Sequence, residues 1–308
     1  MICRLCPRNC GAERTAEPAP VRCAGEKAPA AAAAAPYCGA ASSLPVVAAY
    51  KLHFGEEPCI SPPGSASGTV FFSGCSLRCI FCQNAEISLS EKGVPTGVRR
   101  LREMFDELVD MGAANINLVT ADHYIPAIAE ALTEKPPVPV VFNCSGYEKP
   151  ETLRLLEGRV DIYMPDVKYS LPGPAYRYSR AGDYPAVARA AVAEMYRQTG
   201  DYETDEDGVM RKGVLVRHLI LPGNVNNSFG VIDWFARTFR PGQALFSLMA
   251  QYTPMRGDFP YPELCRRVTR EEYDAVCERL FAAGIEDGFV QEPDAAGKEF
   301  IPEFDYHE

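Results

Sequence analysis

Short apolar runs alternate with amphipathic stretches from residue 69 to residue 283. The apolar runs are typical of buried strands, and the stretches between them repeat apolar residues at helical spacing. Strands are predicted at residues 69–72, 116–119, 138–142, 161–164, 214–221 and 245–249. Helices are predicted near residues 97–111, 125–132, 151–156, 184–198, 227–239 and 271–283. The pattern therefore contains six strand–helix units in succession.

Such an alternation favours an α/β fold with parallel strands and helices packed outside them. Six units are fewer than the eight of a closed barrel, so an open, partial (β/α)6 barrel is the first prediction. A doubly wound sheet is the alternative. In both architectures the functional residues lie at the carboxyl ends of the strands.

The first 66 residues lack this pattern. They contain six of the twelve cysteines, many prolines and the low-complexity run Lys27–Pro36, which we interpret as an inserted loop. We therefore divide the chain into an irregular, cysteine-rich N-terminal extension, residues 1–66, and an α/β domain with a C-terminal tail, residues 67–308.

Composition narrows the class of protein. The chain has 308 residues and a net charge of −10, so a nucleic-acid partner is not expected. We find no apolar run near the ~20 residues of a membrane span, and the first residues do not resemble a signal peptide. Clustered cysteines in such a chain are more often metal ligands or catalytic groups than disulfides. We expect a cytoplasmic protein with no membrane partner.

Cys75, Cys79 and Cys82 follow the first predicted strand with the spacing C-x3-C-x2-C. A [4Fe-4S] cluster needs four thiolates to be fully ligated, so three thiolates leave one iron with an open position. An open position on a metal is where a substrate or cofactor binds. Two other interpretations remain: buried thiols on one helical face, and a zinc site. Zinc fingers usually have two C-x2-C pairs, and no matching pair follows.

The segment Gly74–Cys82, with an aromatic residue at Phe81, resembles the signature of the radical S-adenosylmethionine (SAM) superfamily. The chain is also similar over most of its length to the pyruvate formate-lyase activating enzyme-like family. This second resemblance rests on the segments Glu56-Glu-Pro, Phe71-Phe-Ser-Gly, Cys82-Gln-Asn, Asn115-Ile-Asn-Leu-Val-Thr, Ser145-Gly-Tyr, Asp161–Lys168, Arg217-His-Leu, Leu221-Pro-Gly and Gln251-Tyr.

The resemblance implies a partial (β/α)6 barrel and an oxygen-sensitive enzyme with a [4Fe-4S] cluster and SAM as cofactors. It implies that reductive cleavage of SAM yields a 5′-deoxyadenosyl radical, which takes a hydrogen atom from the substrate. In activating enzymes the substrate is a glycine of a glycyl-radical enzyme, and the electron donor is a protein such as flavodoxin or ferredoxin. Another peptide or small molecule as substrate, and a non-catalytic metal-stabilised binding module, are the alternatives.

Many members of the superfamily carry a Gly-Gly-Glu-like segment after the second strand. This chain has neither the glycine pair nor the glutamate between Asn117 and His123. Thr120 is the replacement that we expect at this place, with Asp122 as the alternative. Asp122 and His123 are otherwise expected to cap the next helix.

Further candidates for contact with the cofactor follow other strands. Asp166 and Lys168 resemble the Asp-x-Lys element of activating enzymes, although a structural salt bridge is an equal interpretation. The remaining candidates are Phe81, Asn143, Ser145, His218 and Gln251. A lone histidine in an apolar strand is more often a hydrogen-bonded core residue than a catalyst, which is the competing interpretation of His218.

The N-terminal cysteines form a second group. Cys3, Cys6 and Cys10 have the spacing C-x2-C-x3-C, and with Cys38 they would form a closed zinc or second iron–sulfur site. Cys23 is the alternative fourth ligand, and unligated thiols are the other interpretation. Three further cysteines are expected only to pack in the interior: Cys144, Cys265 and Cys277.

Overall fold

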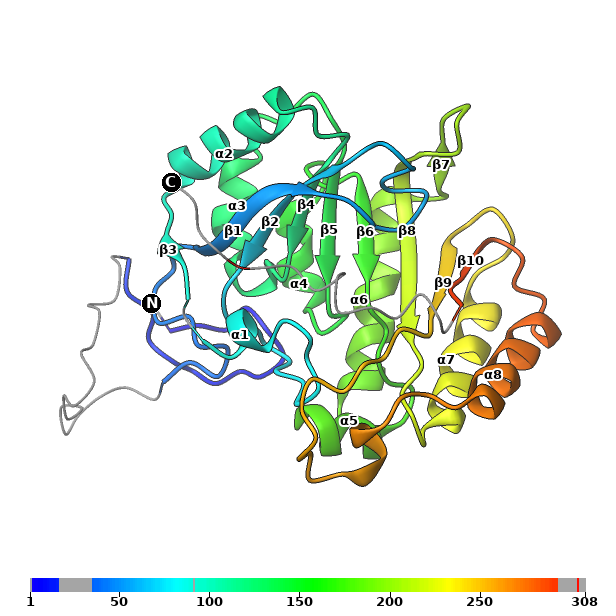
Figure 1. Ribbon diagram of the computed structural model, residues 1–308. Helices are drawn as coiled ribbons and strands as arrows, with labels where there is room; N and C mark the ends of the chain where they lie inside the picture. The colour runs from blue at the N-terminus through cyan, green and yellow to red at the C-terminus, as the bar shows by residue number, and fades with distance from the viewer. Residues whose placement is uncertain (1, 17–34, 91, 293–303, 305–308) are drawn as a thin grey trace.

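The computed structural model describes residues 2–16, 35–90, 92–292 and 304. In these residues the apolar runs form one ten-stranded sheet with the order β10-β9-β8-β6-β5-β4-β2-β1-β3, and β7 pairs with β8 (Figure 1). The chain has a mixed α/β fold around this open sheet, with β3 and β10 at the edges of its main path.

The six predicted strands are all present, adjacent and parallel. They are β2 (Ser67–Phe72), β4 (Ile116–Val119), β5 (Val140–Cys144), β6 (Ile162–Pro165), β8 (Met210–Leu219) and β9 (Leu245–Met249). A doubly wound sheet would reverse its strand order near the middle, so that alternative is wrong. The sheet extends further than predicted: β10 (Gly288–Val290) adds a parallel strand, whereas β1 (Val46–His53), β3 (Val94–Pro95) and β7 (Glu203–Thr204) pair antiparallel.

Six of the described helices pack on one face of the sheet, which we call the outer face. The helices that contribute buried residues to the main core there are α2 (Val98–Asp110), α3 (Ile125–Ala131), α4 (Pro150–Leu153), α6 (Tyr184–Thr199), α7 (Val225–Thr238) and α8 (Arg270–Ala282). Strand residues such as Phe72, Leu118 and Phe142 join this core. The inner face is the opposite one. Short helices α1 (Ala85–Ser88) and α5 (Pro172–Ser179) lie at the end of the sheet that holds the carboxyl ends of β2 and β6 (Figure 1).

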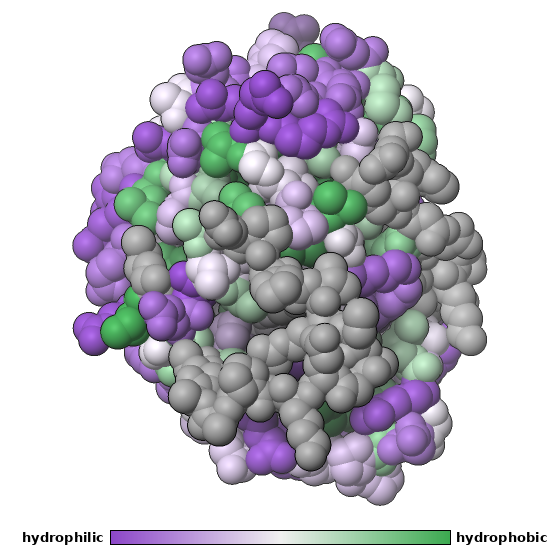
Figure 2. All heavy atoms as spheres, turned by 90° about the vertical axis from the view of Figure 1, so that its left-hand side faces the viewer, coloured by the Kyte–Doolittle hydropathy of each residue, from purple (hydrophilic) through white to green (hydrophobic). Residues whose placement is uncertain are grey.

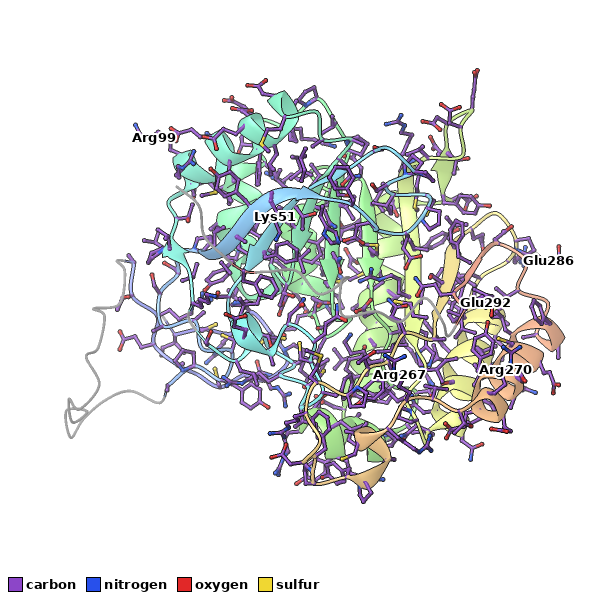
Figure 3. All side chains as sticks on the ribbon, viewed as in Figure 1. Lys51, Arg99, Arg267, Arg270, Glu286 and Glu292 are labelled. Carbon is purple, nitrogen blue, oxygen red and sulfur yellow. The ribbon has the colours of Figure 1, made fainter. Side chains whose placement is uncertain are left out.

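Helix α2 illustrates how the sequence pattern selects the outer face. Leu101, Met104, Phe105 and Leu108 are buried at helical spacing, whereas Arg99 projects from the start of the helix into solvent (Figure 3). Figure 2 shows polar side chains over the upper part of the molecule, where α2 lies. This amphipathic pattern places α2 as predicted.

The N-terminal extension that we expected to be irregular contributes a strand to the sheet. β1 lies within the presumed irregular extension, yet its residues pair with β2 from Val47 to His53. Residues 54–66 then connect β1 to β2 across the inner face, where Cys59 and Ile60 are buried. Most of the low-complexity run, and Cys23, lie outside the described residues. In the part of the chain that the structure covers, no helix is long and apolar enough to cross a bilayer.

Gly68 in β2 lies against the outer helix layer. A Cβ at this position would lie 2.8 Å from the Cβ of Ala113 and 2.9 Å from that of Leu108. We predict that Gly68→Ala lowers the free energy of unfolding by roughly 1–3 kcal/mol, because the contact forces β2 and α2 apart. Urea unfolding measures this value. Gly173→Ala is the control, since a Cβ there meets open space in α5, and an equal loss of stability in both variants would contradict the prediction.

Candidate functional site

Cys75, Cys79 and Cys82 lie in the loop between β2 and α1, which we call the cysteine loop (residues 74–83). The loop is not helical, and Arg78 within it has a φ of 53°. The interpretation of the three thiols as one face of a helix is therefore wrong. Gly74, with a φ of 84°, begins the loop, and a Cβ there would lie 2.5 Å from the carbonyl oxygen of Cys38.

Each of the three sulfur atoms accepts hydrogen bonds from the surrounding protein. Cys75 and Cys79 are buried, and Cys82 is partly buried. The donors are the backbone N–H groups of Leu77 and Arg78 to Cys75 Sγ at 3.4 and 3.5 Å, the hydroxyl of Ser179 to Cys79 Sγ at 3.1 Å, and the hydroxyl of Ser88 to Cys82 Sγ at 3.4 Å. Donors aimed at sulfur are what a thiolate ligand requires in a buried site.

Burial and the charges of neighbouring groups raise the pKa of the Cys75 and Cys82 thiols, so the thiolate forms need a positive partner. A metal centre supplies that charge. Among the described residues, the structure shows no group of three His, Cys, Asp or Glu side chains arranged around a single metal ion, at the cysteine loop or at the N-terminal cysteines. Three free thiols with donors at each sulfur fit the larger iron–sulfur cluster.

A chain of charged groups lies beside the cysteine loop on the inner face. Arg217 Nε donates to Asp166 Oδ1 at 2.7 Å, and Lys168 Nζ donates to Asp166 Oδ2 at 2.8 Å. Burial opposes the charged forms, but the attraction between these groups lowers the pKa of Asp166 and raises that of Lys168. The charges of Cys79 and Cys82 also raise the pKa of Lys168. The predicted salt bridge is thus present, next to the cysteine loop.

The other residues predicted after strands have differing surroundings. Asn143, at the end of β5, accepts a hydrogen bond from Arg217 at 3.0 Å. Thr120 follows β4 with a φ of 60°, and its backbone N–H donates to the carbonyl of Asn143. Ser145 donates to Glu148 Oε1 at 3.4 Å, and Gln251 has a buried carbonyl oxygen without a partner. Their contact with a cofactor stays a prediction.

Two predicted residues lie in packed surroundings. Phe81 is buried, with its ring edge-to-face against Tyr178 and Tyr252. His218 is fully buried on the outer face, where its ring nitrogens contact the carbonyl of Val167 at 2.7 Å and the hydroxyl of Ser228 in α7 at 2.9 Å. These contacts agree with the competing interpretation of His218 as a hydrogen-bonded core residue: its strand neighbour Arg217 faces inward, and alternation directs His218 outward. Burial lowers the pKa of His218 to about 4.

The N-terminal cysteines are only partly brought together. Cys3, Cys6 and Cys38 are buried, and Cys10 is partly exposed. Burial, with the charges of Asp122, Cys38 and Cys3, raises the pKa of Cys6 to about 12, so these thiols lie within electrostatic reach of one another. The backbone carbonyl of Cys38 accepts a hydrogen bond from the N–H of Cys75 at 3.0 Å. The N-terminal group therefore lies directly against the cysteine loop.

Arg8 joins the two groups, and sequence reasoning missed it. Its guanidinium donates to carbonyl oxygens of the cysteine loop and of the end of α5: Ser76, Leu77, Ser179 and Arg180, at 2.5–3.1 Å. It also lies over the ring of Tyr37, with its central carbon 4.1 Å from the ring centroid. The sequence gives one indication of a role for Arg8: it is a cationic residue between Cys6 and Cys10 of the N-terminal motif.

Asp122 and His123 do not cap a helix, which corrects the prediction. Both are buried in a short 3-10 turn, and neither carboxylate oxygen of Asp122 has a hydrogen-bond partner. His123 Nδ1 lies 3.5 Å from Asp122 Oδ1, and its Nε2 lies 2.8 Å from the carbonyl of Ser73. The Asp122–His123 pair thus contacts the chain directly before the cysteine loop, at Ser73.

A groove with a volume of about 710 Å³ opens beside Cys82. Its walls combine aromatic and apolar side chains with two arginines: among its lining residues are Tyr37, Arg78, Leu89, Met255, Arg256 and Phe259. The groove gives one of the three cysteines a route to solvent. Access of this kind is expected of a ligand site rather than of a structural centre.

The chain is similar to proteins of known sequence and of known structure. The chain is 27% identical over 238 residues to the uncharacterized protein MJ0674 of Methanocaldococcus jannaschii, a match that covers 74% of this chain and 64% of that protein. The structure of QueE from Escherichia coli matches 80% of this chain and 93% of QueE, with a TM-score of 0.43 and 10% identity. No protein-family model matches the chain.

Glu148, beside this site, makes stability depend on pH. Its side chain is buried, its Oε2 atom has no partner, and burial with the charge of Asp122 raises its pKa to about 8. The folded protein then holds a proton that the unfolded chain loses above pH 4.5, so this group favours folding less and less as the pH rises from 4.5 to 8.

We predict that Glu148→Gln removes this dependence, stabilising the protein relative to wild type by roughly 3 kcal/mol more at pH 8 than at pH 5. Denaturant unfolding at the two pH values measures the difference. Glu151→Gln, an exposed neighbour, is the control. A Glu148→Gln effect that is the same at both pH values would show that Glu148 is ionised in the folded protein.

Proposed function

We propose that this chain is a radical SAM enzyme that cleaves SAM reductively, with a [4Fe-4S] cluster held by Cys75, Cys79 and Cys82. The observation that carries the proposal is the cysteine loop: three unpaired thiols at the carboxyl end of β2, each with donors aimed at its sulfur. Six adjacent parallel strands with helices on the outer face agree with the partial (β/α)6 barrel that we propose for the fold.

A cluster held by Cys75, Cys79 and Cys82 would supply the electron for the reductive cleavage of a carbon–sulfur bond of SAM. Residues at the same edge of the sheet would bind and orient SAM. We assign Lys168 and Asp166 to its charged groups, because they form a buried ion pair after β6 and the charges of Cys79 and Cys82 act on the ammonium of Lys168. Asn143, Ser145 and Thr120 supply polar contacts at the ends of β5 and β4, and the walls of the groove exclude water.

Replacement of the three cysteines tests the cluster. After anaerobic reconstitution, the wild-type protein is expected to bind iron and sulfide at Cys75, Cys79 and Cys82 and to form 5′-deoxyadenosine from SAM with dithionite. The variant with all three cysteines changed to serine is expected to lose this iron and all turnover, because a serine hydroxyl does not replace a thiolate on iron. Metal analysis and chromatography of the products measure both.

Cys277→Ser is the matched control, since Cys277 is a buried thiol on α8, remote from the cysteine loop in the sequence. It is expected to retain iron and turnover. Wild-type protein that binds zinc tightly, takes up no iron and forms no 5′-deoxyadenosine would contradict the proposal and favour a metal-stabilised binding module.

A second metal site at the N-terminal cysteines belongs to the same proposal. We retain Cys3, Cys6, Cys10 and Cys38 as its ligands, with support from the burial of three of these thiols around a shared charge environment. Metal that remains in the triple serine variant of the cysteine loop belongs to this second site, and its identity distinguishes iron from zinc. A closed site here would be structural or relay electrons.

We further propose that the radical activates a glycyl-radical enzyme, with a flavodoxin or ferredoxin as electron donor and the cytoplasm as the compartment. The groove beside Cys82 supports a substrate segment that enters from solvent. On mixing the reduced enzyme, SAM and a glycyl-radical enzyme encoded nearby, we expect a glycyl doublet by electron paramagnetic resonance. A silent spectrum with every such partner, together with turnover of SAM, would instead favour another peptide or a small molecule.

A further inference from the structure

The segment between β1 and β2, residues 54–66, closes one end of the inner face. Ile60 accepts a hydrogen bond at its carbonyl from the Asn115 side chain at 2.9 Å, and the carbonyl of Cys59 accepts one from the N–H of Met210 at 2.7 Å. The side chains of Cys59 and Ile60 are packed among inward-facing strand residues, including Val141, Ile162 and Leu215. The segment is therefore held firmly against the strands rather than attached as a loose loop.

Two adjacent carboxyl groups on this segment face the inner polar layer. Glu56 Oε1 accepts a hydrogen bond from Asn117 at 2.8 Å, and Glu56 Oε2 lies 3.5 Å from a terminal nitrogen of Arg217. Glu57 instead accepts from Ser247 at 2.9 Å, and burial raises its pKa despite the nearby charge of Arg217. Glu56 is thus the partner of Arg217 on this side, whereas Glu57 is held by a neutral hydroxyl.

Arg217 connects Glu56 to the residues beside the thiols. Its guanidinium has three partners: Glu56, Asp166 through Nε, and Asn143 through the second terminal nitrogen. Asp166 then holds Lys168. Negative and positive groups alternate along this series of contacts: Glu56, Arg217, Asp166 and Lys168. Their charges cancel in a region where the side chains of Glu56 and Arg217 are only 9% and 13% exposed.

We propose that Glu56 is a positioning residue for the SAM site: it fixes the guanidinium of Arg217, which in turn orients Asn143 and the Asp166–Lys168 pair toward the cysteine loop. This inference rests on the proposed function. A planar guanidinium with three fixed acceptors has one orientation, and removal of one charged acceptor leaves a buried positive charge with an unpaired N–H. The remaining partners then shift to compensate.

The test compares Glu56→Gln with Glu57→Gln in the full chain, reconstituted anaerobically. The two substitutions change adjacent residues in the same way, but only Glu56 pairs with Arg217. Glu56→Gln is expected to raise the KM for SAM by roughly tenfold or more with iron content unchanged, since the loss of a buried charge partner acts on orientation and not on the thiols. Glu57→Gln is expected to keep the KM of the wild type. Glu56→Asp retains the charge and is expected to have a KM between those of the wild type and Glu56→Gln.

A second readout does not depend on the cofactor. In the protein without iron, the Arg217 Nε–H signal in nitrogen-15 NMR, assigned by its absence from Arg217→Lys, is expected to exchange slowly with water. The exchange is expected to become faster in Glu56→Gln and to stay slow in Glu57→Gln.

The possible results separate the two proposals. An unchanged KM in Glu56→Gln, an equal rise in Glu57→Gln, or unchanged exchange of the Arg217 signal would overturn the positioning role. Wild-type protein that shows the protected Arg217 signal but binds neither iron nor SAM would overturn the proposed function itself, and with it the assignment of Glu56 to a SAM site.

Discussion

Charge compensation inside the protein is the constraint on which the rest of this structure depends. Three thiols, two carboxylates, a lysine and an arginine lie at one face of a parallel sheet, largely out of contact with water. An isolated buried charge is costly, so each group needs a partner or a change of protonation state. The arginine, lysine and carboxylates satisfy one another. The thiols have only neutral donors and one nearby ammonium, and this imbalance is why a metal centre fits there.

Parallel strand geometry brings these groups together. Residues from the ends of β2, β4, β5 and β6 converge because parallel neighbours place their carboxyl ends at the same edge. The sequence therefore predicted the six parallel strands and the edge that carries the cysteine loop, but not β1, β3, β7 or β10. Short apolar runs bounded by glycine or polar residues carry that information locally.

The sequence could not assign faces within β8. Both faces of this strand are covered, so the residues before and after Arg217 and His218 are apolar on both faces. The alternation along the strand therefore does not show which of the two faces inward. His218 was consequently retained as a candidate for cofactor contact, whereas its neighbour Arg217 is the residue that faces the inner side. The role of residues 54–66 was invisible for a different reason: their partners, such as Asn115 and Ser247, are distant in the sequence, and the segment has no periodicity of its own.

The N-terminal segment and the cysteine loop behave as one structural unit. The backbone N–H of Cys75 donates a hydrogen bond to the carbonyl of Cys38. Arg8, in the N-terminal segment, donates to the carbonyl of Ser179 at the end of α5, and the hydroxyl of Ser179 donates to Cys79. A ligand that binds only the folded state stabilises every element that its site holds in place. A metal bound by either cysteine group would therefore order the other, because the Cys38–Cys75 contact and the Arg8 hydrogen bonds transmit the constraint. On this argument the N-terminal cysteines are part of the wall of the site, although Cys3, Cys6 and Cys10 lie more than sixty residues before the central triplet in the sequence.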